Sequence, residues 1–436
     1  MFFFSQIASV ASTQPYLTHG PVTGNVDFNS ATVFIRTNIS STVKLKYSTN
    51  SQFTTYLVSS AATTTLTDDF STKINLDSLS PSTTYYLDVL VNDTPQLTTP
   101  YPYFKTFPSE SESADLKIVH LTDFCCIRRY KLSPTNTFVN AGLENPDVVL
   151  IGGDFDHRNP SGTNQNDARV QKRDMFKDLY SPVTSTTFVN SILRHYPLAH
   201  MWDDHDYATN NSDKTYLYKS ISLEVLNEFF PTYATSPYGD WQKFRIAQAE
   251  FFLLDSRSQR DPKKKPDNAD KSMLDGDNLG VKGQLEWLKQ GLLNSTATWK
   301  FIVSPVVFNP TTSKNDSWAG YLTERAQIVN FANQNNIKNI LVISGDLHGG
   351  GIDNGNNSDF PEMLVPQSNL PSGTDISCFT ALNIGKWSQG IYGSDTLSAC
   401  QGYGVIEVLT NPDRVVLKVK DSNGESRLSY TVPFSP

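Results

Sequence analysis

The sequence has no apolar run long enough to span a membrane and no stripe of lysine and arginine. The 436 residues carry a net charge of −8, and the one basic cluster, residues 263–265 between two prolines, is most simply a solvated loop. Nucleic-acid binding through a broad basic face is therefore disfavoured. Internal repeats and a convincing Ser-His-Asp or Cys-His arrangement are also missing. The 38% apolar and 11% aromatic content still predicts a folded chain of two or three domains.

Cysteine is scarce, with four residues in two pairs. Cys378 and Cys400 span a Gly/Ser-rich stretch, which is consistent with a disulfide that closes a loop in an oxidising compartment. Cys125 and Cys126 lie inside an acidic motif, which favours a ligand role or burial over bridging. Residues 1–14 are apolar without a basic n-region, so they are either a short secretion signal or simply an apolar start. We expect a secreted, periplasmic or otherwise extracytoplasmic protein.

The first hundred residues have the pattern of a β domain. In residues 43–47 apolar side chains alternate with lysine, as in a half-buried strand, and residues 30–35 and 85–91 are further Thr-, Tyr- and Val-rich strands. The run Leu79-x-Pro-x-Thr-x-Tyr85 resembles the corner of fibronectin type III modules, in which the tyrosine bonds to upstream backbone. We predict a small β-sandwich over residues 15–107 and a linker over residues 108–115.

From residue 116 onward, short apolar runs alternate with helical stretches. The runs cover residues 116–121, 148–151, 198–202, 251–254, 301–303 and 340–343. One helix places Leu285, Leu288 and Leu292 on one face, and another is expected over residues 323–333. This alternation predicts an α/β layered domain over residues 116–436, closed by antiparallel strands at residues 405–409, 415–419 and 428–432.

Acidic clusters follow several of these runs. They are Leu-Thr-Asp-Phe-Cys-Cys126, Gly-Gly-Asp-Phe-Asp-His-Arg158, Trp-Asp-Asp-His-Asp206 and Ser-Gly-Asp-Leu-His-Gly349. In open α/β sheets the loops beyond the carboxyl ends of the strands lie together, so five aspartates can meet at one edge: Asp123, Asp154, Asp204, Asp255 and Asp346. Without cations these acids would repel one another. A lone aspartate after a strand is usually a turn or helix cap, but the ordered set predicts a dinuclear metal centre.

The order of the clusters resembles the metallophosphoesterase series Asp-x-His, Gly-Asp-x-x-Asp-Arg, Gly-Asn-His-Asp/Glu and Gly-His-x-His. Trp-Asp-Asp-His-Asp206 with the following Asn210-Asn211, Ser-Gly-Asp-x-His348 and Leu-Asp-Ser-Arg257 are similar to the PhoD-like alkaline phosphatases. The resemblance implies a four-layer metallophosphatase-type α/β sandwich preceded by a fibronectin III-like β-sandwich. It also implies hydrolysis of phosphate monoesters by a metal-activated water.

The resemblance further implies two metal ions, bridged by Asp154. The ligands of one ion would be Asp123, His348 and Cys125, or Cys126 under a one-residue shift, and those of the other Asp204 and Asp346. His157 stands where the family generally has a tyrosine ligand. Oxygen ligands suit calcium, magnesium or manganese, whereas thiolate and imidazole admit iron or zinc, so we expect two divalent or mixed-valence ions.

Three further residues receive catalytic roles from the same resemblance. His205 would be the acid that stabilises or protonates the leaving oxygen, and Arg257 and Arg128 would clamp phosphate oxygens. The expected partners are small phosphate esters, and the protein is expected to be a monomer.

Alternative functions are a phosphodiesterase with the same centre, a secreted binding protein that lost catalysis, and a functional sandwich with the larger domain as scaffold. The remaining histidines receive no catalytic role: His120 is expected to be packed, His195 and His200 to be structural, and His19 has no assigned function.

Overall fold

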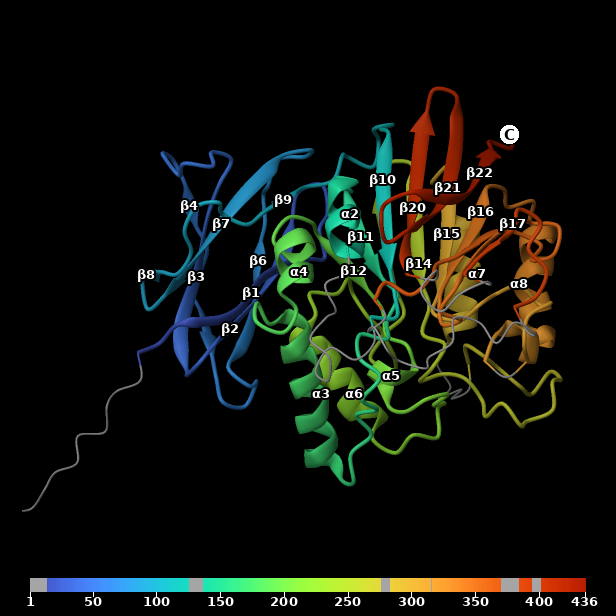
Figure 1. Cartoon of the computed structure of the whole chain (residues 1–436), viewed down its shortest axis with the longest axis horizontal. Helices are drawn as coiled ribbons and strands as arrows, with labels where there is room; N and C mark the ends of the chain where they lie inside the picture. The colour runs from blue at the N-terminus through green and yellow to red at the C-terminus, as the bar shows by residue number, and fades with distance from the viewer. Residues whose placement is uncertain (1–13, 125–135, 276–282, 315, 370–383, 394–400) are drawn as a thin grey trace, which may run out of the picture.

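The structure is a computed structural model of the chain that describes residues 14–124, 136–275, 283–314, 316–369, 384–393 and 401–436. Within these residues the strands form sheets of nine, seven and six strands (Figure 1). The predicted cysteine ligands, the predicted Cys378–Cys400 disulfide and Arg128 lie outside the described residues. No helix in the described ranges is both long and apolar enough to cross a membrane.

The nine-stranded sheet combines strands from both ends of the chain. In spatial order its strands are β22 (Ser426–Pro433), β21 (Asp413–Asp421), β20 (Gly402–Thr410), β10 (Leu116–Leu121), β11 (Val148–Ile151), β12 (Leu198–His200), β1 (Leu17–Gly24), β2 (Ala31–Thr37) and β6 (Ser71–Leu76). Strands β10, β11 and β12 are parallel, while β20, β21 and β22 are antiparallel, which confirms the expected closing strands.

The seven-stranded sheet comes from the second half of the chain. Its order is β13 (Gln242–Ile246), β14 (Ala249–Leu253), β15 (Trp299–Ser304), β16 (Ile340–Ser344), β18 (Pro361–Leu364), β17 (Gly350–Asn354) and β19 (Ile391–Tyr392). Strands β14, β15, β16 and β18 are parallel. Buried parallel strands contact apolar neighbours on both faces, which explains why most of them are continuous apolar runs in the sequence.

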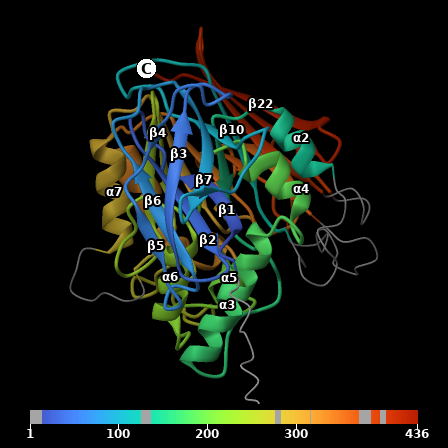
Figure 2. The same ribbon diagram turned by 90° about the vertical axis from the view of Figure 1, so that its left-hand side faces the viewer.

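Helices cover the outer faces of the two large sheets. They are α2 (Thr137–Leu143), α3 (Gln165–Tyr180), α4 (Thr186–Phe188) with the π-helical turn η1 (Val189–Leu193), α5 (Asp204–Tyr207), α6 (Lys219–Phe229), α7 (Gln284–Asn294), the 3₁₀ turn η2 (Trp318–Gly320) and α8 (Leu322–Gln334). In Figure 2, which views the molecule from the sandwich side, α7 lies on one flank and α2 and α4 lie on the other.

Three apolar clusters define the layers. The inner faces of the two large sheets share one core, in which Ile118 and Leu150 lie with Phe301 and Leu341. A second cluster joins the outer face of the nine-stranded sheet to α2, α3 and α6, and a third joins the outer face of the seven-stranded sheet to α7 and α8. The order is therefore helix, sheet, sheet, helix, which confirms the predicted four-layer α/β sandwich.

The N-terminal sandwich has one sheet of its own and shares the other. Its own sheet contains β4 (Leu57–Val58), β3 (Ser41–Ser48), β7 (Thr84–Val91) and β8 (Thr94–Pro95), with β5 (Ala62–Thr64) paired to β3 and β9 (Tyr103–Lys105) paired to β7. The expected tyrosine corner is present, because the Ser80 N–H donates to the Tyr85 hydroxyl oxygen at 2.9 Å.

The other sheet of the sandwich extends the nine-stranded sheet. Strand β1 pairs in parallel with β12 at Gly24 and Leu198. The junction is tight, since a Cβ on Gly24 would lie 2.5 Å from the Pro231 carbonyl oxygen. Lys73 of β6 also donates to the carbonyls of Asn227 and Phe230 at the end of α6. The sandwich thus protects the edge of β12, the strand that leads into the Trp-Asp-Asp-His-Asp segment.

Candidate metal centre

The predicted acids lie on loops that follow parallel strands of both large sheets. Asp123 follows β10, Asp154 follows β11, Asp204 follows β12, and Asp346 follows β16. Because the carboxyl ends of parallel strands meet at one edge of a sheet, acids that are distant in sequence converge. The structure brings these four aspartates together with His157, His205 and His348.

Several of these residues have a left-handed backbone. The φ angles are 53° at Asp123, 55° at Asp154, 72° at Asp346 and 59° at His348. Residues other than glycine adopt this region rarely, and aspartate and histidine tolerate it better than most. Such conformations persist where surrounding contacts hold them and are frequent at functional sites.

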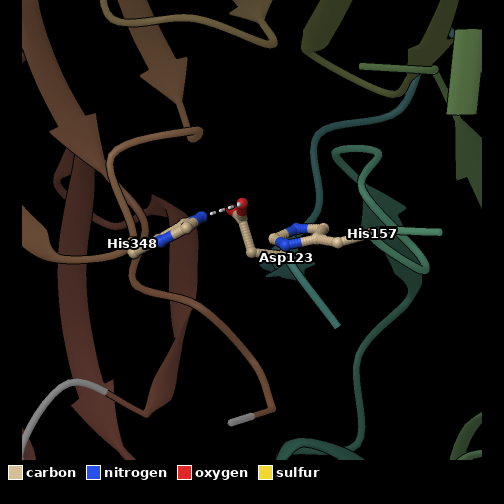
Figure 3. A group of neighbouring side chains, drawn as sticks. All are labelled: Asp123, His157 and His348. Atoms are coloured by element: carbon tan, nitrogen blue, oxygen red, sulfur yellow. Dashed lines mark ion pairs between the residues drawn. The ribbon is translucent and has the colours of Figure 1, made fainter. Parts of the chain in front are cut away.

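The first ligand cluster, here called the imidazole group, contains Asp123, His157 and His348. One potential ligand atom from each lies within 4.8 Å of the others. Figure 3 shows the two imidazoles on either side of the Asp123 carboxylate, with His348 Nε2 at 3.2 Å from Asp123 Oδ1. The ring of His157 also stacks on that of His205, with 4.1 Å between the ring centres. Imidazole and carboxylate ligands together suit iron, zinc or manganese.

The second ligand cluster, here called the carboxylate group, contains Asp204, Asp316 and Asp346. All its potential ligands are carboxylate oxygens, which suit calcium, magnesium or manganese. Burial and the Asp316 charge raise the pKa of Asp346 well above its ordinary value. The cluster therefore carries an excess of negative charge that a cation would relieve.

Asp154 lies between the two groups. It forms one potential ligand set with His157 and His205, and another with Asp203 and Asp204. Burial and the charges of Asp204 and Asp203 raise the pKa of Asp154 well above its ordinary value. A carboxylate in this position can donate one oxygen to a cation on each side.

Polar atoms at the centre also fit bound cations. The buried atoms without a hydrogen-bond partner in the described part of the chain include five at the centre: Asp123 Oδ1, Asp204 Oδ1, His157 Nε2, His205 Nδ1 and Asn211 Oδ1. Most buried polar atoms in folded proteins have a partner, so unpartnered ligand atoms beside carboxylates fit a cation-binding site. Carboxylate, imidazole and amide oxygen are all metal-binding groups.

Arg257 contacts the acids of the carboxylate group. The side chain is 0% exposed, and its guanidinium donates to the Asp203 carboxylate, to both oxygens of Asp316 at 2.8 and 2.9 Å and to Asp346 at 2.8 Å. These contacts leave Arg257 without an exposed donor for a phosphate oxygen. Its predicted role as a phosphate clamp stays a prediction, and its contacts favour a role as counter-ion to the acids.

The loops of the second and third motifs are fastened to each other. The carboxylate of Asp206 accepts the backbone N–H groups of Asp154, Phe155 and Asp203. Gly153, with φ of 94°, permits this approach, because a Cβ there would lie 2.3 Å from the Asp203 nitrogen. His205 N–H in turn donates to Asp154 Oδ1 at 3.1 Å.

Other residues singled out by the sequence belong to none of the ligand clusters. Asp255 accepts the Trp202 indole N–H at 2.9 Å and the Asp240 backbone N–H at 3.0 Å. Both carboxylate oxygens are therefore hydrogen-bonded to buried groups. His120 is fully buried, and burial lowers its pKa to about 3. His200 is buried between the rings of Phe155 and Phe230.

Asp316 is the acid that the sequence patterns missed. It lies in the loop between β15 and η2, a dozen residues beyond the end of its strand, so it does not directly follow an apolar run. The sequence pattern likewise does not distinguish Asp203 from its neighbour Asp204, although the Asp203 side chain caps α5 and pairs with Arg257. The sequence gives no signal for Asp316.

Family models match two parts of the chain. Residues 121–354 match the family model described as PhoD-like phosphatase, and residues 14–109 match that of a domain of unknown function (DUF7800). Among curated proteins the chain is similar to alkaline phosphatase D of Bacillus subtilis (strain 168), with 24% identity over 316 residues. That alignment covers 64% of this chain and 53% of the relative, so it spans about half the length of the relative.

Two solved structures share the fold. A structure described as PhoD has a TM-score of 0.73 at 18% identity and covers 95% of this chain and 90% of its own. Purple acid phosphatase PPD1 from yellow lupin (Lupinus luteus) has a TM-score of 0.61 at 14% identity, with 96% of this chain and 74% of its own covered. At these identities the likeness concerns the fold.

Proposed function

The chain belongs to the PhoD-like phosphatase family, and from this membership we propose that it is a metal-dependent hydrolase of phosphate esters with a dinuclear centre. The observation that carries the proposal is the pair of ligand clusters with Asp154 between them. Packing does not explain either cluster, because each brings several potential metal ligands within 4.8 Å of one another and includes buried polar atoms without a hydrogen-bond partner in the described residues. The alkaline phosphatase name of the Bacillus relative supports phosphomonoesters as the first substrate class to test.

Each residue of the centre has a proposed role. Asp123, His157 and His348 would hold one cation, Asp204 and Asp346 the other, and Asp154 both, with Asn211 and Asp316 as further oxygen ligands near the second. When bound, two such cations neutralise phosphoryl charge and lower the pKa of a water that attacks phosphorus in line. The buried acids would hold the two cations, and none of them needs to form a covalent bond to the substrate.

His205 is the proposed acid for the leaving oxygen. Its ring stacks on that of His157, and Nδ1 has no hydrogen-bond partner within the described residues. Burial lowers the pKa of His205, while the Asp204 charge opposes this shift. A phosphate ester in the site adds negative charge beside the ring and so favours the protonated form that an acid requires.

The test is metal analysis of purified protein combined with hydrolysis of an aryl monophosphate before chelation, after chelation and after metal add-back. We expect two ions per chain and activity that follows the metal. Asp154→Asn is expected to lower kcat by about a thousandfold, which corresponds to about 4 kcal/mol of transition-state stabilisation. Asp174→Asn, on the exposed face of α3 where Asp174 pairs with Lys177, is the matched control and should retain activity.

A phosphodiesterase is the second candidate, and one observation favours it. Arg257 and Arg260, the arginines beside the carboxylate group, both donate to Asp316. Neither is therefore free to neutralise the extra charge of a monoester. A bis-aryl phosphate assayed beside the aryl monophosphate separates the candidates by their kcat/KM values. If metal-replete protein releases no product from either ester and Asp154→Asn changes only stability, the protein is a non-catalytic binder of this fold.

A further inference from the structure

A lysine is buried behind the third motif, apart from the ligand clusters. Lys172 of α3 is 0% exposed. Its ammonium donates to the carbonyl oxygens of Tyr207 and Asp206, the last two residues of α5, and lies 5.3 Å from the ring centre of Tyr216. Within the described residues it forms no ion pair with a carboxylate.

A buried ammonium is costly, and packing alone does not require one. Lysine is almost never fully buried unless it is paired, because its charge loses hydration. Burial lowers the pKa of Lys172 to about 7, and the Asp206 charge opposes this shift. A methionine would fill similar space against the apolar neighbours of α3. What the ammonium adds is a charged donor to two backbone carbonyls.

Those carbonyls belong to the turn that carries two site residues. Helix α5 is a single turn that includes Asp204 and His205. Its amino end is fastened to the Asp154 loop by Asp206, whereas its carboxyl end is held by Lys172 and by the Ser222 hydroxyl, which donates to the Tyr207 carbonyl at 2.8 Å. One turn of helix is not stable by itself, so its ends depend on such contacts.

The chain beyond α5 returns to the centre. Ala208 leaves the helical conformation, and the Asn211 N–H then donates to Asp204 Oδ2. The position of the carboxyl end of α5 therefore sets where Asn211 meets Asp204. A shift of this turn would move two proposed oxygen ligands and His205 together.

We propose that Lys172 is a positioning residue of the metal centre, which holds the carboxyl end of α5 and thereby orients Asp204 and His205. Its effect on catalysis rests on the proposed function, whereas its effect on the α5 turn does not. The two can therefore be measured separately.

The experiment compares Lys172→Met, Lys172→Arg and Lys177→Met in the full chain. Lys177 lies on the same helix, partly exposed, and pairs with Asp69 and Asp174, so its substitution controls for loss of a lysine from α3. Hydrogen exchange of the backbone amides of residues 203–211 is measured in metal-free protein. Manganese binding is measured by calorimetry, and kcat and KM are measured on an aryl phosphate.

We expect Lys172→Met to speed exchange in residues 203–211 about tenfold or more relative to the rest of the chain, because two hydrogen bonds from a charged donor are lost. Manganese affinity and kcat should fall by about tenfold as well, with KM changed less than kcat. Lys172→Arg keeps a charged donor and should restore much of the protection, and Lys177→Met should match the wild type.

The proposal is overturned if exchange in residues 203–211 is unchanged in Lys172→Met, or if exchange rises equally throughout the chain. Should the methionine variant not fold, Lys172→Gln, which keeps an uncharged donor, is measured in its place against the same criteria. If no phosphate ester is hydrolysed even by the wild type, the proposed function fails, while the exchange and manganese data still decide the role of Lys172.

Discussion

Replacement of Arg257 with methionine removes the positive charge at the centre of four aspartates. The guanidinium is 0% exposed, contacts Asp203, Asp316 and Asp346 directly, and lies 3.6 Å from Asp204. Removal of one partner from a buried ion pair leaves the other charge uncompensated and typically costs about 3–5 kcal/mol. We therefore expect the free energy of unfolding of metal-free protein to fall by about 3–5 kcal/mol.

Bound metal should reverse part of this loss. A divalent cation in the carboxylate group supplies the charge that the variant lacks, so the variant should bind it more tightly. At a concentration a hundredfold above the dissociation constant, binding stabilises a protein by about 2.7 kcal/mol, and tighter binding adds to that value. The gain in stability on metal addition should thus be larger in Arg257→Met than in wild type.

Urea denaturation with a chelator and with calcium or manganese measures both quantities. Arg169→Met is the control, because Arg169 and Glu224 form an exposed ion pair for which about 0–1 kcal/mol is expected. The reasoning is refuted if the chelated Arg257→Met protein is as stable as wild type. It is also refuted if metal stabilises the two proteins equally.

Three further predictions concern other buried positions. Burial raises the pKa of Glu362 from 4.5 to about 7. The contribution of Glu362 to stability is therefore complete below pH 4.5 and is lost as the pH rises to about 7. In denaturant titrations, Glu362→Gln should be more stable than wild type by up to about 3 kcal/mol at pH 8 and equally stable at pH 4. Gly153→Ala should lower both thermal stability and metal affinity, because its Cβ would lie 2.3 Å from the Asp203 nitrogen. The control is Gly424→Ala, where φ is 82° and the added Cβ has no contact under 3.4 Å. This control should lower the free energy of unfolding by only about 1–2 kcal/mol and leave metal binding intact. His200→Phe should raise stability by about 1–2 kcal/mol because neither ring nitrogen has a partner within the described residues, and a lower melting temperature would contradict this.

Local patterns predicted the strands well where both faces are buried. The apolar runs at residues 116–121 and 148–151 coincide with β10 and β11, and the helix expected at 323–333 is α8 within one residue at each end. The apolar run at 198–202 extends beyond its strand, since β12 ends at His200. Trp202 leaves the strand because its backbone N–H and its indole N–H donate to Asp240 and Asp255, contacts that no apolar pattern reveals.

The shared sheet of the sandwich was beyond such patterns. Gly24 and Leu198 are far apart in sequence, and their pairing depends on how β1 fits the edge of β12 and on the Lys73 contacts to α6. A sequence pattern predicts that a segment forms a strand, but it does not predict which other strand pairs with its edge. The division into two domains therefore stays a prediction.

The sequence by itself determined which metal-binding side chains are available, because aspartates and histidines that directly follow parallel strands lie at the carboxyl edge of the sheets. Tertiary structure alone decided which of them meet. It separated an imidazole group from a carboxylate group, placed Asp154 between them, added Asp316 from a distant loop, and enclosed Arg257 among the acids. The physical reason is that hydrophobic periodicity is a local property, whereas the packing of one sheet on another brings together residues more than 200 positions apart, as in Asp123 and His348.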